Sequence, residues 1–383
     1  MTPHALNRDP EPSYAATPTD SAPPALLQRL RGLAHASLPV MYNHAAQRYV
    51  FTVRRSERSL VPDGVSDRYT AITLIGLSAD GVERWSLPFV PADLVNAMIA
   101  KLPESTNLGD AALIAWAARA VGGDSAAAWR QVERLFASAE AHPTVEVAWA
   151  LAAAAIAGTE VSGALQKSLA ASVLKAWNPG AALFGHTAGG RGARSHVACF
   201  ADQVYPIFAL SRYAAAHADL PALDAAVRCA RRICALQGDA GQWWWHYDHR
   251  TGNVIEGYPV YAIHQDAMAP MALRAATEAS GEPFGDYIRR GVEWLEACPE
   301  LNGGTLIDES AQMLWRKVAR REPGKATRYI QAACAMLHPR VRMPGVDTLF
   351  PPGTIDYEDR PYHWGWFLYA WAEAQDPSPA RRR

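Results

Sequence analysis

Side chains that can exchange protons gather in two short segments of the sequence. HQD places His264 two residues before Asp266 at the end of a long loop, and TIDYEDRPYHWGW over residues 354–366 holds several carboxylates. A histidine beside a carboxylate can act as a general acid or base, and crowded carboxylates raise the pKa of one member. Acid–base chemistry is therefore expected, and Tyr258 of the long loop adds a phenol. The candidate catalytic residues are His264, Asp266, Glu358, Asp359 and Tyr258.

The loop over residues 241–270 begins with three consecutive tryptophans. Three neighbouring indoles cannot all face one core, because neighbours point in different directions. A turn over 251–253 predicts that WWWHYD and VIEGYPVY pair as two short strands. Alternation then gives one face with Trp244, His246 and Asp248, and another with Trp243, Trp245 and Tyr247. The first face is expected to contact a ligand, with Trp245 and Tyr247 in the core.

From residue 67 onward the sequence reads as one helix after another, with a helix over 24–36 and a short strand over 49–54 before it. Glycine at 158 and 281 and Asn-Pro at 178–179 provide stops. The expected helices cover 68–78, 91–102, 109–121, 124–138, 143–157, 161–176, 201–217, 220–236, 265–280, 283–298, 325–338 and 361–375. This pattern predicts an all-α protein.

The helices are of two alternating kinds. Some, such as TVEVAWALAAAA, are apolar on nearly every face, whereas others, such as LDAAVRCARRICAL, are amphipathic. Buried helices alternating with half-exposed ones fit an α/α toroid, in which an inner ring is wrapped by an outer ring. We expect one toroid domain over 24–376 with a small N-terminal extension and a hairpin in the long loop, a disordered leader over 1–23 and a disordered tail over 377–383. An α-solenoid is the alternative.

In a toroid the N-terminal ends of the parallel inner helices meet at one mouth. Each carboxylate there also fits a helix N-cap, but the segments that add tyrosine, histidine or arginine favour a site, since these are poor caps. The polar residues expected at this mouth are Arg68, Tyr69, Asn107, Asp110, Glu146, Asp202, Gln203, His264, Gln265, Asp266, Asp356, Glu358, Asp359, Arg360, Tyr362 and His363. The glycine-rich loop over 184–200 is expected to act as a flap, with Arg191 and Arg194 meeting an anionic group.

Two motifs resemble known families. Residues 237–243 read Q-x3-G-x-W, which resembles the glutamine–tryptophan turn of terpenoid-cyclase and prenyltransferase toroids and the turns of six-hairpin glycosidases and related epimerases and lyases. The resemblance implies a toroid and gives Trp243 a structural role. DYED over 356–359 resembles the D-x-D-D acid motif of class II terpene cyclases, with Glu358 at the position of the protonating aspartate.

Composition limits the classes of partner. The 383-residue chain has 37 Lys+Arg against 38 Asp+Glu, a net charge of -1, which argues against nucleic acid as the main partner. The N-terminus lacks a secretory signal, no apolar run is long enough to span a membrane, and five cysteines without CxxC fit reduced thiols. The cytoplasm is the expected compartment. The histidines show no zinc-binding pattern, and neither a metal nor an organic cofactor is expected.

Three functions fit these residues. The first is a carbohydrate-active enzyme, a hydrolase, lyase or epimerase, that acts on a poly- or oligosaccharide, with uronate-containing saccharides among the candidates. Aromatic faces stack on sugars, and arginine can hold a uronate carboxylate. The second is a terpene cyclase-like enzyme, which predicts a deep apolar cavity with one acid cluster. The third, a non-catalytic helical binding protein, predicts that the polar groups of 68–69, 264–266 and 356–363 do not converge. The oligomeric state stays open.

Overall fold

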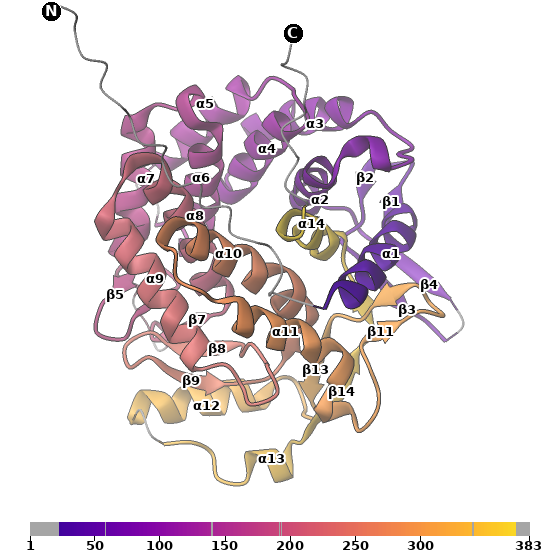
Figure 1. Ribbon diagram of the computed structural model, residues 1–383, viewed down its shortest axis with the longest axis vertical. Coiled ribbons are helices and arrows are strands. Elements are labelled where there is room, and N and C mark those ends of the chain that lie inside the picture. The colour runs from indigo at the N-terminus through magenta and orange to yellow at the C-terminus, as the bar shows by residue number, and fades with distance from the viewer. Residues whose placement is uncertain are drawn as a thin grey trace, which may run out of the picture.

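The computed structural model describes residues 23–57, 59–138, 141–190, 192, 194–338 and 341–372. The expected leader, apart from Pro23, and the expected tail lie outside these residues, and so does Arg191. Within the described part, helices dominate and the strands are short (Figure 1). The predicted all-α class is confirmed.

Six helices of the described chain form an inner ring, in which each packs against the next and α14 packs against α2. Figure 1 shows α14, near the end of the chain, lying beside α2. A π-helical turn, His264–Met268, precedes α10 and also packs against α14. The inner helices are α2 (Asp67–Asp80), α4 (Leu108–Ala120), α6 (Thr144–Ala157), α8 (Ala201–His217), α10 (Ala269–Ser280) and α14 (Pro361–Ala370).

An outer ring covers these helices, and each outer helix packs against an inner one. The difference between the rings follows from sequence. α6 is buried on nearly every side and rich in alanine, whereas in α5 the buried residues follow a helical stripe and charged residues cover the other side. The outer helices are α1 (Pro24–Val40), α3 (Pro91–Ile99), α5 (Ala126–Phe136), α7 (Gly163–Lys175), α9 (Leu220–Ala235) and α11 (Gly285–Ala297). The predicted toroid is therefore confirmed, and the solenoid alternative is wrong because the inner ring closes.

Short antiparallel strands connect the helices on the side of the inner helices' N-terminal ends. The expected strand over 49–54 is split in two by a turn at residues 50–51. The two-stranded sheets are β1 (Tyr42–Asn43) with β2 (Arg48–Tyr49), β5 (Trp177–Asn178) with β6 (Leu183–Phe184), and β11 (Ile307–Asp308) with β12 (Met313–Leu314). The three-stranded sheets are β15 (Glu358–Asp359), β3 (Thr52–Arg55) and β4 (Leu60–Asp63); β7 (Val197–Cys199), β8 (His246–Asp248) and β9 (Asn253–Glu256); and β10 (Val260–Tyr261), β13 (Lys317–Arg320) and β14 (Pro352–Asp356).

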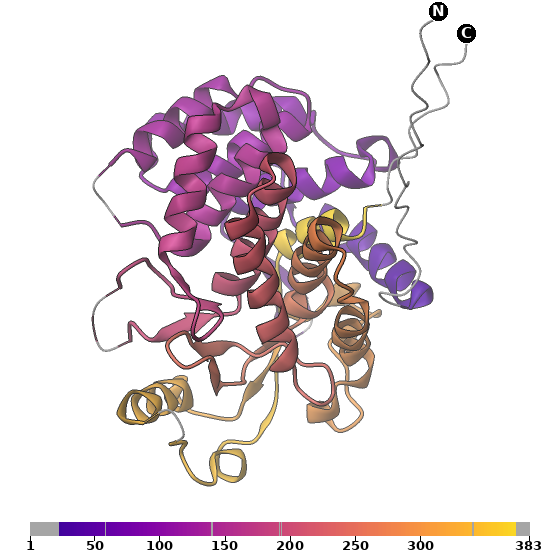
Figure 2. The same ribbon diagram turned by 60° about the vertical axis from the view of Figure 1, so that its left-hand side comes forward.

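Two further helices lie outside both rings. They are α12 (Ala326–Leu337) and the short α13 (Val346–Leu349), and they stand at the lower edge of the molecule in Figure 2. α12 packs against β9, so this segment covers the β7–β8–β9 sheet. Among the described residues, no helix combines the length and the apolar character needed to cross a membrane.

The turn over residues 237–243 is structural, as expected. Gln237 donates to the backbone carbonyls of Gly241 at 3.0 Å and Tyr287 at 2.9 Å, which ties the turn to α11. Gly241 has a positive φ of 98°, and a Cβ there would lie 2.1 Å from the Arg290 carbonyl oxygen. Trp243 is completely buried and packs on Gly291. The motif therefore closes a helix pair and does not line a binding site.

The ring closes through a contact between two glycines. A Cβ on Gly76 of α2 would lie 2.1 Å from the carbonyl oxygen of Gly365 in α14, so the two backbones touch. We predict that Gly76→Ala lowers the free energy of unfolding by about 1–3 kcal/mol, as overpacking does. Gly32→Ala is the matched control, because Gly32 of α1 is exposed with open space around its Cα, and it should raise stability by about 0.5–1 kcal/mol. Urea denaturation measures both; equal stability of the two variants would contradict the contact.

Candidate functional site

A cavity of about 200 Å³ lies at the N-terminal ends of the inner helices. Two cations, Arg68 and Arg316, stand in its wall among aromatic and apolar side chains, and no carboxylate lines it among the described residues. Its aromatic residues are Tyr69, Trp149, Tyr205, Trp245, Tyr261, His264 and Tyr362, and its apolar ones are Ile72, Val145, Ala201 and Met268. The cavity therefore offers positive charge and ring faces.

Arg68 comes from the first turn of α2, where the N-cap Ser66 accepts from the backbone N–H of Tyr69. Its Nε donates to the Asp110 carboxylate at 2.5 Å, and its guanidinium lies 5.3 Å from the Trp149 ring centroid. Asp110 belongs to α4 and Trp149 to α6, so three successive inner helices hold this cation in place.

Arg316 precedes β13 and also lines the cavity. Its Nη1 lies 3.0 Å from a Glu358 oxygen and 3.6 Å from Asp356, and its guanidinium packs 5.2 Å from the Tyr261 ring. Its Nε is buried and has no hydrogen-bond partner among the described residues. An unmade bond at a buried guanidinium is costly, so a ligand that accepts a hydrogen bond is favoured here.

Ring contacts shape the rest of the wall. Tyr69 and Tyr362 stack with centroids 4.4 Å apart, which joins α2 to α14 at the mouth. Trp245 stacks on His264 with ring centroids 5.7 Å apart, and it also contacts the ring of Tyr261. Burial lowers the pKa of His264 to about 3, so its imidazole is neutral at physiological pH. His264 can exchange hydrogen bonds with a ligand but is a weak base.

Two carboxylates lie beside the Arg68 wall. Asp110 and Glu146 are half-buried residues in the first turns of α4 and α6. Asn107 connects them, because its side chain accepts from the Asp110 N–H at 2.9 Å and donates to Glu146 at 2.9 Å. Glu146 also packs against Gly109 next to Trp149. Asp110 and Glu146 are thus neighbours next to two residues that line the cavity.

A histidine–aspartate pair continues this acidic edge. His186 Nδ1 lies 3.1 Å from an oxygen of Asp202, which is buried and also accepts from the Cys199 N–H at 2.7 Å. The hydrogen bond to Asp202 raises the pKa of the His186 imidazole above its usual value. His186 itself is exposed, and the first turn of α6 holds its loop, since the Thr144 N–H donates to the His186 carbonyl at 2.8 Å.

The prediction that His264 and Asp266 form an acid–base pair is wrong. Asp266 instead accepts from His363 Nε2 at 2.7 Å, and both residues are buried between the π-helical turn and α14. Positions two residues apart on a helix point in different directions, so His264 faces the cavity while Asp266 faces α14. Burial opposes a charge on His363, but Asp266 outweighs this and raises the pKa of that imidazole. This pair joins two inner helices.

The predicted crowding of Asp356, Glu358 and Asp359 is also wrong. Asp356 pairs with Lys317 at 2.5 Å, and Glu358 pairs with Arg54, Arg316 and Arg360 at 3.0–3.1 Å. Asp359 is buried and accepts from the indole of Trp364 and from two backbone N–H groups, and burial raises its pKa to about 6. Cations separate the three carboxylates, so they form no shared acid. Asp359, Arg360 and His363 line a small cavity that shares Arg316 and Tyr362 with the large one.

The long loop pairs as a hairpin, but its faces differ from the prediction. The strand begins only at His246, so the alternation does not extend to the tryptophans. Trp245 lines the cavity instead of the core, while Trp244 packs on Gly238 and Gly257. Tyr247 is completely buried, as expected.

Among the predicted site residues that do not line the cavity, five are held elsewhere in the fold. Trp244 is one of them. His246 is buried within the sheet with its pKa lowered to about 3 by burial, and Asp248 is buried and paired with Arg250. Tyr258 donates to Glu300 at 3.0 Å, and the guanidinium of Arg194 lies 4.8 Å from the ring of Tyr329. These contacts are with other parts of the fold.

Of the residues expected at the mouth, Arg68, Tyr69, His264 and Tyr362 come together, with Asp110 beside them. Sequence reasoning missed Trp149, Tyr205, Tyr261, His186 and Arg316. A signal existed for the first two, because each follows an expected mouth residue, Glu146 or Asp202, by one helical turn. Arg316 carried none, since it sits in a short irregular segment.

Among the described residues, no group of three or more His, Cys, Asp or Glu side chains is arranged to hold a metal ion. The carboxylates next to the cavity, Asp110, Asp356 and Glu358, are paired with Arg68 and Arg316 instead. No residue set for a cofactor is therefore assigned.

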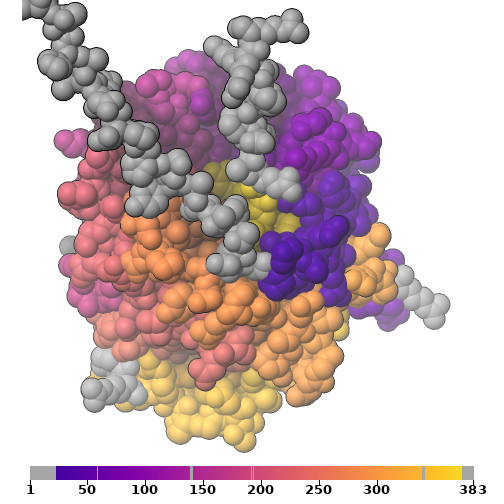
Figure 3. Space-filling view, viewed as in Figure 1, coloured from indigo at the N-terminus to yellow at the C-terminus, as the bar shows by residue number. Residues whose placement is uncertain are grey.

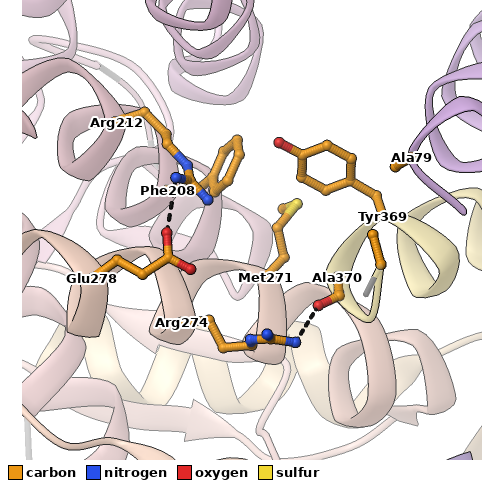
Figure 4. A pocket seen from close by; sticks show the side chains of 9 residues that line it. Ala79, Phe208, Arg212, Met271, Arg274, Glu278, Tyr369 and Ala370 are labelled. Atoms are coloured by element: carbon orange, nitrogen blue, oxygen red, sulfur yellow. Dashed lines mark hydrogen bonds and ion pairs between the residues drawn. The ribbon is translucent and has the colours of Figure 1, made fainter. Parts of the chain in front are cut away.

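A different cavity, of about 270 Å³, opens where the inner helices end (Figure 4). Arg212 pairs with Glu278 at 2.8 Å, and Arg274 donates to the Ala370 carbonyl at 2.7 Å. In Figure 3, α14 lies in the middle of the visible face, between α1 and the orange helices. Both arginines of this cavity are thus occupied by partners within the fold, Arg212 by a carboxylate and Arg274 by a carbonyl at the end of α14. The cavity is therefore assigned a structural role.

The His363–Asp266 pair predicts a pH dependence of stability. Because the pKa of His363 is raised in the folded protein, the pair stabilises fully below the unfolded value of about 6.5 and less as pH rises through the folded value. Relative to Asp266→Asn, the native protein should lose up to about 1.4 kcal/mol per pH unit in that window. Urea denaturation between about pH 6 and pH 9 measures the difference. The exposed His44→Gln is the control, and parallel curves for native protein and Asp266→Asn would refute the assignment.

No protein-family model and no curated protein matches the sequence. Solved structures do. An unsaturated glucuronyl hydrolase specific for heparin is 13% identical, covering 90% of this chain and 96% of that chain at a TM-score of 0.56.

Two further structures agree with this match. The unsaturated glucuronyl hydrolase of Bacillus sp. GL1, described as responsible for the degradation of glycosaminoglycan, is 13% identical over 91% of this chain and 94% of that one, at a TM-score of 0.53. The unsaturated glucuronyl hydrolase of Streptococcus agalactiae is 8% identical over 90% of this chain and 89% of that one, at a TM-score of 0.54. The chain has the α/α-toroid fold of the six-hairpin glycosidases.

Proposed function

We propose that this protein is a carbohydrate-active enzyme that binds a uronate unit of an oligosaccharide in the mouth cavity and acts on it by acid–base chemistry. The observation that carries the proposal is the pair of guanidinium groups, Arg68 and Arg316, in a wall of aromatic rings. Arginine binds carboxylates through a planar fork, and aromatic faces pack against the apolar faces of a sugar ring.

The spare donor of Arg316 supports an anionic ligand. Its Nε has no partner among the described residues, whereas its Nη1 is already held by Glu358. A uronate carboxylate at this point supplies the missing acceptor and meets no carboxylate in the described cavity wall. A neutral sugar makes the same stacking contacts but forms no charge-assisted hydrogen bond between a carboxylate and a guanidinium group.

Asp110 and Glu146 are the carboxylates best placed for the chemistry. Glycoside hydrolysis needs two carboxyl groups, one to protonate the leaving oxygen and one to activate water or attack the sugar. Asp110 and Glu146 are half-buried, adjacent through Asn107, and next to Arg68 and Trp149. We favour hydrolysis over elimination or epimerisation, because His264, with a pKa near 3, is a poor base for removing a sugar C–H proton.

The similar structures add support at the level of the fold. The three structures named above are unsaturated glucuronyl hydrolases. A shared fold at this identity does not transfer a reaction, so the weight rests on the cavity itself.

The two other functions fit this cavity less well. A terpene cyclase must stabilise a carbocation, and two guanidinium groups in the wall repel one. Its acid cluster is also dispersed among cations, as described for Asp356, Glu358 and Asp359. A binding protein without catalysis predicted separated polar groups, whereas Arg68, His264 and Tyr362 line one cavity.

Binding of a uronate tests the ligand. Arg316→Gln should weaken binding of a glucuronate-terminated disaccharide by about 10–150-fold, because a charged hydrogen bond contributes roughly 1.5–3 kcal/mol. Titration calorimetry against the matching glucose-terminated disaccharide measures the selectivity. Arg228→Gln, on the outer helix α9, removes a half-buried arginine that pairs with Asp224 outside the mouth cavity, and it should bind like the native protein. Native-like binding by Arg316→Gln would contradict the proposed cavity.

Turnover tests the chemistry. Asp110→Asn should lower kcat on uronate-terminated oligosaccharides by about 10²–10⁴-fold, the usual contribution of a proton-transfer residue. Released sugars are followed by chromatography over a panel of glycosaminoglycan fragments. Asp224→Asn, at an exposed ion pair of α9, is the control and should retain full activity. If native protein releases no sugar from any fragment, or Asp110→Asn remains fully active, the hydrolytic assignment fails.

A further inference from the structure

A second cleft lies beside the mouth, between β9, β13 and the α12–α13 segment. Its volume is about 480 Å³, and it is lined by Glu256, Arg320, Gln331, Asp347 and Thr348 among others. None of these residues lines the mouth cavity, so the cleft is a separate feature of the described structure.

Glu256 is the unusual group in this cleft. It is 2% exposed, and its Oε1 accepts from the Tyr258 N–H at 2.9 Å and from Arg320 Nε at 3.0 Å. Its Oε2 is buried and has no partner among the described residues. A buried carboxylate oxygen without a donor is costly, so the cleft favours a ligand that donates a hydrogen bond to it.

Charges in the cleft are balanced. Arg320 lies between Glu256 and Asp347, at 3.0 and 2.8 Å, and Arg342 donates to the Val254 carbonyl at 2.6 Å. The described lining of the cleft therefore contains two cations and two carboxylates. The described lining of the mouth cavity contains two cations and no carboxylate. The cleft suits a neutral polyhydroxyl group and disfavours an anion, because the free oxygen of Glu256 repels negative charge.

The wall of the cleft is built onto the toroid. Val197, Ile255, Ala332 and Ala335 form a small hydrophobic cluster that fixes α12 on the β7–β8–β9 sheet. His196 Nε2 lies 3.0 Å from the Ala332 carbonyl oxygen, which adds a polar link. These contacts hold α12 in place on the sheet, so the wall of the cleft is a packed part of the fold.

One strand connects the two sites. Arg316, just before β13, lines the mouth cavity, and Arg320, at the end of β13, lines the cleft. Four residues of extended strand span about 13 Å. The partner segment runs alongside, since Tyr261 of the mouth pairs with Lys317 and Val260 pairs with Val318. An oligosaccharide of a few units covers this separation.

We propose that this cleft is a second saccharide-binding subsite, which takes an unsulfated neutral sugar of the same oligosaccharide whose uronate occupies the mouth, with a sugar hydroxyl donating to Glu256 Oε2. The proposal rests on the proposed function, because the mouth must bind the uronate. It gives the chain a preference for longer substrates and for an uncharged unit a few positions from the uronate.

Thr348→Phe tests the subsite without touching the Glu256–Arg320 pair. Thr348 is exposed, lines the cleft and lies on the short helix α13, so a phenyl group there narrows the cleft. Titration calorimetry is run with a uronate-terminated disaccharide and with tetrasaccharides that carry or lack sulfate on the distal unit. The native protein should bind the unsulfated tetrasaccharide about tenfold more tightly than the disaccharide, and Thr348→Phe should remove this ratio.

Thr159→Phe is the control, because Thr159 is exposed beyond the end of α6, outside the cleft, and its tetrasaccharide-to-disaccharide ratio should match the native one. Equal binding of disaccharide and unsulfated tetrasaccharide by native protein would overturn the subsite and leave the uronate site standing. Equal or tighter binding of the sulfated tetrasaccharide, or an unchanged ratio in Thr348→Phe, would also overturn it. If neither saccharide binds, the proposed function falls and takes the subsite with it.

Discussion

Backbone contact between α2 and α14 is the constraint on which the site depends. Gly76 and Gly365 let the first and last inner helices touch, and this contact closes the ring. Only in a closed ring do the first turns of α2 and α14 share one mouth, where Tyr69 stacks on Tyr362 and Arg360 donates to the Tyr69 hydroxyl at 3.0 Å. A side chain at either glycine separates these helices and with them the two halves of the cavity wall.

The direction of the inner helices decides which groups are exposed at each end of the ring. At the C-terminal end, backbone carbonyls need donors, and Arg31 and Arg274 donate to the carbonyls of Trp371 and Ala370. At the N-terminal end, acidic residues such as Asp110 and Asp202 suit the helix dipoles. Arg316 enters that end from the segment just before β13, and its Nε has no hydrogen-bond partner among the described residues.

The sequence predicted the rings better than the site, for a physical reason. The local periodicity of apolar residues shows whether a helix is buried on all faces or on one face. The inner and outer helices could therefore be assigned with their approximate ends. Partner choice is not local. Asp266 pairs with His363, 97 residues away, and not with His264, and Glu358 pairs with Arg54 and Arg316 from other segments. Trp245 lines the cavity because the strand starts at His246, three residues later than expected, a boundary that alternation alone could not locate.

The same strand geometry links recognition to chemistry. The segment 316–320, which includes β13, carries a cation into each of the two cavities, and the carboxylates around those cations differ. Arg316 shares Glu358 with two other arginines, which leaves positive charge at the mouth, whereas Arg320 is matched by Glu256 and Asp347. The mouth and the cleft therefore differ in charge, and Asp110 and Glu146 lie next to Arg68 at the mouth. Under the proposed function and the proposed subsite, an extended ligand is recognised by its own alternation of charge. The unit that carries the carboxylate then fixes which bond is presented to Asp110 and Glu146.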